Sequence, residues 1–99
     1  MPNIYYAEAA LQDLDEIWRY FAQGSSTRAS EFVRELDETL KLLLEFPYMG
    51  RERNEWKEGL RSLNHKKYVI AYQVIDGDVV IERVVHGSRD IEGLFRDEE

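Results

Sequence analysis

Two strand-like blocks in the second half of the chain meet at Asp76-Gly77, and this junction constrains the fold more than any other feature. The blocks run from Lys67 to Ile75 and from Val79 to Val85, and both are rich in β-branched and aromatic residues. An Asp-Gly pair accepts the positive φ angles that a type I′ turn requires. The sequence therefore predicts a tight antiparallel hairpin at this point.

Two further strands are expected. Gly59–Leu63 precedes the hairpin and predicts a three-stranded antiparallel meander. Asn3–Tyr6 is short and β-prone and follows Pro2, which suits a strand at the edge of the sheet. Between them, Arg51–Glu58 is charged and irregular and is interpreted as a loop in which Arg51 and Arg53 are surface charges.

Apolar residues recur every three or four positions in two segments, the first from Ala7 to about Gly24 and the second ending at Phe46, before Pro47. The connector, Gly24-Ser25-Ser26, offers a serine N-cap and is short enough to require an antiparallel helical hairpin. Trp18 shares the first apolar stripe and is expected in the core. The opposite, polar face of this helix carries Asp13, Asp15, Glu16 and Arg19.

Side chains alternate along the strand Lys67–Ile75. One unbroken apolar set is assigned to the helix-covered core: Tyr68, Ile70, Tyr72 and Val74. The other set, Val69, Ala71, Gln73 and Ile75, is also too apolar for water. Since two helices cannot cover both faces, we expect this set to be shielded by the tail Ile91–Phe95 or by another protein. The fold class is α+β: an edge strand, an antiparallel helical hairpin and a three-stranded meander.

A chain of 99 residues suits one small domain, which we assign to residues 1–96, with a disordered acidic tail at residues 97–99. With no cysteine and two histidines, no disulfide, metal site or cofactor is expected. No secretion signal or apolar span is evident, so a cytoplasmic location is expected. The net charge of −7 disfavours a groove that follows nucleic acid over many nucleotides, or direct sequence-specific binding to it.

Five residues suit metal-free RNA cleavage, which needs a proton-transfer group and cations around the phosphate. They are His86, Arg61, Arg89 and the Lys66-Lys67 pair. Predicted strand ends bring the first three together as a small basic patch. Each has a plainer interpretation: His86 as a hydrogen-bonded structural residue, the arginines as partners of carboxylates such as Asp90, and the lysines as solvated turn residues.

Trp56 lies in the charged loop without an apolar stripe around it. It is the best single aromatic candidate for contact with a partner protein. Covering the end of a small core is an equally good interpretation.

Several short patterns occur in a fixed order along the whole chain: Asp13-Leu14-Asp15-Glu16-Ile17, Phe46-Pro47, Gly50, Gly59-Leu60-Arg61-Ser62 and Val85-His86-Gly87-Ser88-Arg89-Asp90. In this order they resemble the ParE branch of the RelE/ParE toxin family. The resemblance implies a strand–helix–helix–three-strand fold, a ParD-like antitoxin and poisoning of DNA gyrase by binding rather than catalysis. Candidate contacts to the target are Arg61, His86, Arg89 and Trp56.

The RelE branch shares this fold but cleaves mRNA on the ribosome, and Arg61 and Arg89 match arginine positions of that pattern. Where such enzymes often have a tyrosine near the end, this chain has Phe95, which cannot exchange a proton. Ribosome-dependent cleavage by His86, Arg61 and Arg89 is therefore the alternative. The acidic charge departs from the basic character of this toxin group, so a different target or a non-toxic homologue is a third hypothesis.

Overall fold

Five strands form one mixed sheet in the order β1-β5-β4-β3-β2 in the computed structural model, which describes residues 1–96. The elements, in chain order, are β1 (Ile4–Tyr6), α1 (Glu8–Gly24), α2 (Ser26–Glu45), β2 (Arg51–Glu52), β3 (Arg61–His65), β4 (Tyr68–Ile75), β5 (Asp78–His86) and α3 (Ile91–Arg96). The acidic tail predicted for residues 97–99 lies outside the described residues. Among the described residues, no helix combines the length and apolarity that a membrane span requires.

The predicted meander is confirmed by antiparallel pairing of β3 with β4 and of β4 with β5. Asp76 and Gly77 have φ angles of 52° and 85°, as a type I′ turn requires. The pairing of β4 with β5 shifts register between Ala71 and Tyr72, which leaves Glu82 as an extra residue on β5.

Two details of the sheet differ from the sequence prediction. β1 lies at the edge as expected but runs parallel to β5, so the sheet is not wholly antiparallel. No turn signal links these distant strands, and their relative direction depends on the path of the chain between them. Arg51–Glu52, predicted as loop, forms a two-residue strand beside β3. Backbone pairing with β3 satisfies groups that the local sequence alone would leave to water.

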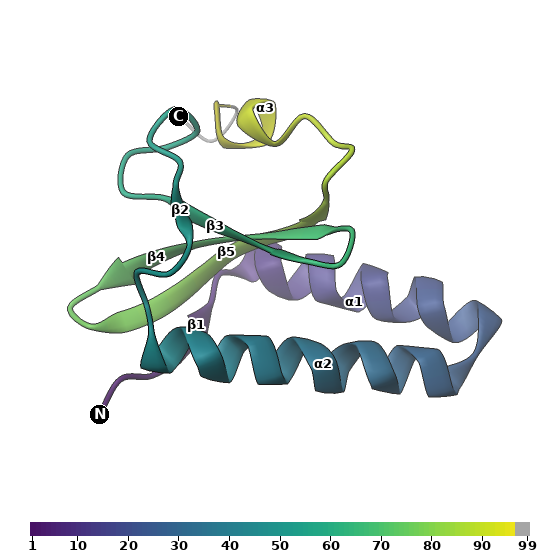
Figure 1. Cartoon of the computed structure of the whole chain (residues 1–99). Helices are drawn as coiled ribbons and strands as arrows, with labels where there is room; N and C mark the ends of the chain where they lie inside the picture. The colour runs from purple at the N-terminus through teal and green to yellow at the C-terminus, as the bar shows by residue number, and fades with distance from the viewer. Residues whose placement is uncertain (97–99) are drawn as a thin grey trace.

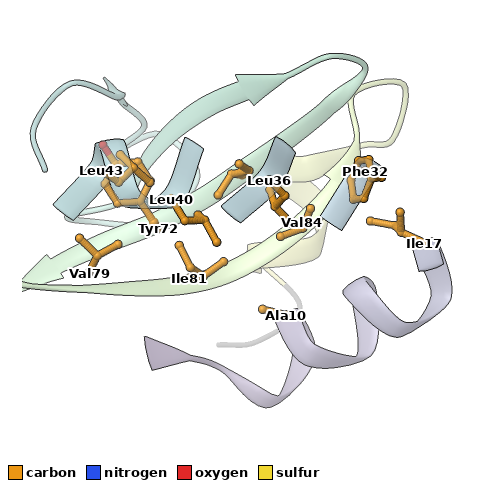
Figure 2. Packing of buried hydrophobic residues seen from close by; sticks show 11 residues of the cluster. Ala10, Ile17, Phe32, Leu36, Leu40, Leu43, Tyr72, Val79, Ile81 and Val84 are labelled. Atoms are coloured by element: carbon orange, nitrogen blue, oxygen red, sulfur yellow. The ribbon is translucent and has the colours of Figure 1, made fainter. Parts of the chain in front are cut away.

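The two long helices lie together beneath one face of the sheet, as an antiparallel hairpin (Figure 1). The Ser25 hydroxyl accepts from the Arg28 N–H, which confirms the serine N-cap. The core between hairpin and sheet contains Ala10, Ile17, Phe32, Leu36, Leu40, Leu43, Ile70, Tyr72, Val79, Ile81 and Val84 (Figure 2). Tyr68 and Val74 pack against it, so the strand face assigned to the helices is confirmed.

The opposite face of the sheet has a smaller core, formed by Leu60, Ala71, Val85, Ile91 and Phe95. The last two belong to α3, which lies across this face (Figure 1). The tail therefore supplies the cover that the apolar second face requires, although it does not reach the end of β4, where Ile75 is 47% exposed.

The predicted buried face of α1 is wrong at Trp18 and at Asp13. Its buried residues are Ala10, Asp13 and Ile17, whereas Trp18 is 44% exposed. Trp18 follows a buried residue by one position, which turns it about 100° around the helix axis. Asp13, expected on the polar face, can be buried because Arg83 and the backbone of Val84 donate hydrogen bonds to it.

Candidate functional site

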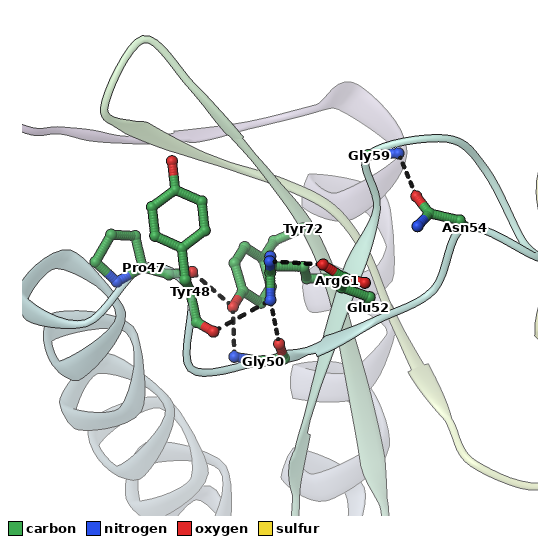
Figure 3. Close-up of polar contacts among 8 residues, drawn as sticks. All are labelled: Pro47, Tyr48, Gly50, Glu52, Asn54, Gly59, Arg61 and Tyr72. Atoms are coloured by element: carbon green, nitrogen blue, oxygen red, sulfur yellow. Dashed lines mark hydrogen bonds and ion pairs between the residues drawn. The ribbon is translucent and has the colours of Figure 1, made fainter.

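Arg61 lies at the start of β3, where its side chain holds the turn between α2 and β2. Its Nη1 donates to the carbonyl oxygens of Tyr48 and Gly50 at 3.1 and 2.8 Å, and its Nη2 lies 3.3 Å from Glu52 Oε1 (Figure 3). The guanidinium carbon also lies 5.1 Å from the centre of the Tyr48 ring. Most of its donors are therefore used within the fold.

Tyr72 holds the same turn from the core side. Its hydroxyl donates to the Pro47 carbonyl at 2.8 Å and accepts from the Gly50 N–H at 2.9 Å (Figure 3). Burial raises the pKa of Tyr72, so the hydroxyl keeps its proton for the Pro47 bond. A Cβ on Gly50 would lie 2.7 Å from the Tyr72 ring and 2.9 Å from the Ser62 carbonyl oxygen, so this position requires glycine.

His86 and Arg89 lie at the other end of the sheet. They line one hollow of about 170 Å³ beside α1. Along β4, His86 pairs with Tyr68 and Arg61 pairs with Tyr72, on opposite sides of the strand. Four residues of strand correspond to about 13 Å, before the width of β4 is added. The predicted patch of three basic residues is therefore wrong as a unit: the structure brings His86 to Arg89 but not to Arg61.

The ring of His86 is oriented by Ser88, two residues further along the chain. Its Nδ1 accepts from the Ser88 N–H at 3.1 Å and lies 2.8 Å from the Ser88 hydroxyl. Since Nδ1 is the acceptor, the proton of the neutral ring is on Nε2. The free nitrogen of neutral His86 is thus a hydrogen-bond donor rather than a proton acceptor. Arg89 has no ion pair within residues 1–96, so neither Asp90 nor Glu92 neutralises it there.

Trp56 is partly buried against the smaller core, with the Arg53 guanidinium carbon 4.4 Å from its ring centre. Arg53 Nε in turn donates to the Ser62 hydroxyl at 2.8 Å, and its side chain is 22% exposed. The expectation that Arg53 is plain surface charge is therefore wrong, because it joins the loop to the sheet. Trp56 was interpreted either as a contact for a partner protein or as a residue that covers the end of the core. Its position matches the second interpretation.

Sequence reasoning missed two features. One is a cluster beneath the β3–β4 turn, where Lys66 Nζ lies 2.6 Å from Glu35 Oε2 and His65 Nδ1 lies 3.3 Å from the Thr39 hydroxyl. The contact with Lys66 holds the pKa of Glu35 below its usual range. No sequence pattern announces this cluster, because its members come from α2 and from a turn far along the chain.

The second missed feature is an apolar hollow of about 310 Å³ between α1 and α2, near β1. Its exposed members include Tyr6, Trp18 and Val33, which are 39, 44 and 48% exposed. We call this hollow the hairpin groove. The apolar residues of each helix form a wider stripe than one core-facing surface needs. This width is the sequence signal that could have indicated a second, exposed apolar surface.

Among the described residues, no group of three histidine, cysteine, aspartate or glutamate side chains is placed to hold a metal ion.

Residues 4–91 match the family model described as ParE toxin of type II toxin-antitoxin system, parDE. The chain belongs to the ParE toxin family. Curated ParE relatives include Toxin ParE1 of Caulobacter vibrioides, 35% identical over 80 residues that cover 80% of this chain and 82% of the relative. Toxin ParE3 of the same organism is 29% identical, with 80% of each chain covered.

Solved structures share the ParE fold. The chromosomal ParDE system from P. aeruginosa matches with a TM-score of 0.71 and 22% identity, over 87% of this chain and 96% of that one. The intact E. coli RelBE toxin-antitoxin complex matches with a TM-score of 0.60 and 24% identity, over 90 and 100%. These likenesses establish the RelE/ParE-like α+β fold, which the sequence predicted. The family match identifies this member as a ParE-type toxin of a type II toxin–antitoxin system.

Proposed function

We propose that this ParE-family toxin acts by binding and poisoning DNA gyrase, without catalysing a reaction itself, and that a ParD-like antitoxin neutralises it. The observation that carries the proposal is the separation of Arg61 from His86 and Arg89. Metal-free RNA cleavage needs its cations and its proton-transfer group around one phosphate. Here Arg61 is engaged in a turn and lies more than about 13 Å along the sheet from His86.

Two further observations support a function in binding rather than in catalysis. Neutral His86 offers an N–H at Nε2 and has no free acceptor nitrogen, since Nδ1 is bonded to Ser88. Phe95, at the position where RelE-type enzymes often have tyrosine, is 2% exposed and part of the smaller core. It therefore supplies neither a proton nor a surface contact. We assign target contact to the pair His86 and Arg89, whereas Arg61 and Trp56 have their contacts within the fold, in the turn after α2 and against the smaller core.

The antitoxin is assigned to the hairpin groove. An amphipathic segment that buries its apolar side chains against Tyr6, Trp18 and Val33 would cover exposed apolar surface on β1 and on both helices. The P. aeruginosa neighbour is a ParDE system, which supports a partner of the ParD type for this chain.

The gyrase assignment is tested by mixing purified toxin with DNA gyrase, DNA and ATP, and by measuring cleaved DNA after protein denaturation. We expect cleaved DNA to accumulate with toxin and to decrease when the product of the neighbouring gene is added. Translation-dependent mRNA cuts in place of cleaved DNA would establish the RelE-like alternative. Absence of both activities on induction in cells would leave a non-toxic homologue that acts only as a binding partner.

A further inference from the structure

A hollow of about 520 Å³ lies where the end of α1 and the start of α2 meet the β3–β4 turn and the end of β5. Its wall contains four aromatic rings, three basic side chains and a histidine, but no carboxylate. The residues that matter here are Tyr20, Arg28, Lys67, Tyr68 and His86. We call it the basic hollow. A carboxylate-free basic wall is unexpected in a chain of net charge −7.

The charges of this wall are largely available. Within residues 1–96, five lysine or arginine side chains form no ion pair: Arg28, Arg34, Arg51, Lys67 and Arg89. Two of the five line the basic hollow, and Arg89 lines the adjoining small hollow, which shares Tyr20, Tyr68 and His86 with it. Lys66 is already paired with Glu35. Three of the five unpaired cations thus lie at one end of an acidic molecule.

The adjoining hollow has two carboxylates in its wall, Asp13 and Glu16. Asp13 is engaged by the Arg83 guanidinium at 2.8 and 2.9 Å, so its charge is compensated. Only Glu16 faces this end without a described partner, against Arg28, Lys67 and Arg89. The local balance therefore favours an anion.

Three of the four aromatic rings pack against one another at the base of the basic hollow, whereas the fourth, Tyr20, is exposed. Phe21 and Phe32 stack at 5.2 Å between ring centres, and Tyr68 contacts Phe32 edge-on at 5.3 Å. Tyr20 leans on Phe21 at 5.5 Å but is 67% exposed. A flat ligand can therefore pack against Tyr20 over a floor that the protein core already holds in place.

We propose that the basic hollow binds a single nucleotide unit. The base packs against Tyr20 and Tyr68, and the phosphate lies among Arg28, Lys67 and the Nε2–H of His86. A volume of about 520 Å³ lies within the range of pockets that enclose one small ligand. The short reach of the basic surface excludes a long nucleic-acid track, in agreement with the charge of the chain. The proposal does not rest on the gyrase assignment, although the basic hollow shares His86 with the surface assigned to target contact.

The test is a titration of the purified chain with adenosine 5′-monophosphate, followed by isothermal calorimetry and by shifts of backbone amide resonances. We expect shifts concentrated around residues 20, 28, 67 and 86. Adenosine, which lacks the phosphate, and ribose 5-phosphate, which lacks the base, should each bind at least tenfold more weakly. Binding that is equal for the mononucleotide and for ribose 5-phosphate would overturn the role of the rings.

Matched variants distinguish binding at the basic hollow from nonspecific attraction of the ligand to positive charge. Arg28→Ala with Lys67→Ala should weaken mononucleotide binding at least tenfold, and Tyr20→Leu at least threefold. Arg34→Ala with Arg51→Ala removes the same charge from unpaired arginines outside the hollow and should change binding less than twofold. Circular dichroism establishes that each variant is folded. Equal losses in both double variants would overturn the site.

Two other ligands complete the test. A short acidic peptide with one central phenylalanine that binds more tightly than the mononucleotide would overturn the proposal in favour of a protein partner. A short single-stranded oligonucleotide distinguishes the sources of the nucleotide. A tenfold gain over the mononucleotide indicates a unit within a strand, whereas no gain indicates a free nucleotide, and both results support the site.

Discussion

Asp13 of α1 and Arg83 of β5 form a two-pronged ion pair, with Nε–Oδ2 and Nη2–Oδ1 distances of 2.8 and 2.9 Å. The Val84 N–H donates to the same carboxylate at 2.9 Å. The side chains of the pair are 7 and 15% exposed. The pair ties the first helix to β5 immediately after its bulge, so it holds one long helix against the sheet.

Asp13→Ala should lower the free energy of unfolding by about 3 kcal/mol, because Arg83 and the Val84 N–H both lose their bonds to this buried carboxylate. Urea unfolding followed by circular dichroism measures the loss. Asp15→Ala is the matched control, since Asp15 and its partner Arg19 are 60 and 73% exposed and should contribute less than about 1 kcal/mol. Equal effects of the two substitutions would contradict the structural role of Asp13.

Gly50→Ala should destabilise the fold by about 2 kcal/mol, because the new methyl group meets the Tyr72 ring and the Ser62 carbonyl. Tyr72→Phe should itself cost about 1–3 kcal/mol, since the Pro47 carbonyl and the Gly50 N–H lose their partner. In the double variant the effects should be less than additive, because the hydroxyl that crowds the methyl group is gone. Additive losses would show that the two residues act separately.

The contact between Lys66 and Glu35 makes stability depend on pH in the acid range. Because the pKa of Glu35 is lower in the folded chain, its carboxylate stabilises the fold above the unfolded pKa, and this contribution is lost as pH falls through the folded pKa. Glu35→Gln should therefore flatten the decline in urea midpoint between about pH 5 and pH 3. Glu31→Gln, at an exposed position of the same helix, is the control and should leave the profile unchanged.

Arg89 and Arg61 should separate in their effects on toxicity and stability. Arg89→Ala should change the unfolding free energy by less than about 0.5 kcal/mol while reducing growth inhibition in cells, because its side chain is exposed and unpaired among the described residues. Arg61→Ala should cost about 1–2 kcal/mol, because two backbone carbonyls lose a charged donor. If Arg89→Ala loses stability and toxicity together, its assignment to target contact fails.

Trp18→Ala should weaken antitoxin binding at least tenfold, as expected when a large aromatic side chain is removed from an interface. It should reduce stability by less than Ile17→Ala, because Trp18 is 44% exposed and Ile17 only 7%. Calorimetry with the purified product of the neighbouring gene measures the affinity. Ile75→Ala removes an exposed apolar side chain from the far end of β4 and should leave the affinity within twofold.

How far the sequence predicts this protein is clearest from two pairs of residues. Asp76-Gly77 identifies its turn correctly, because the required φ angles belong to the pair itself. Arg61 and His86 were expected together, because both lie near strand ends. Arg61 begins β3 and His86 ends β5, and these two strands run in the same direction on either side of β4, so the residues lie at opposite ends of the sheet. Strand direction is a property of the whole meander, so the local sequence around either residue does not reveal their separation.

What the sequence determined by itself is local in origin: the helical hairpin with its serine cap, the β4–β5 hairpin and the apolar face of β4 that meets the helices. The tertiary structure alone decided the rotation of α1, since burial of Asp13 depends on an arginine 70 positions away. It likewise gathered Arg28, Lys67 and His86 around one hollow. Helices and tight turns follow from the backbone preferences of neighbouring residues. Whether a charged side chain can be buried depends instead on a partner that can be far away in the sequence.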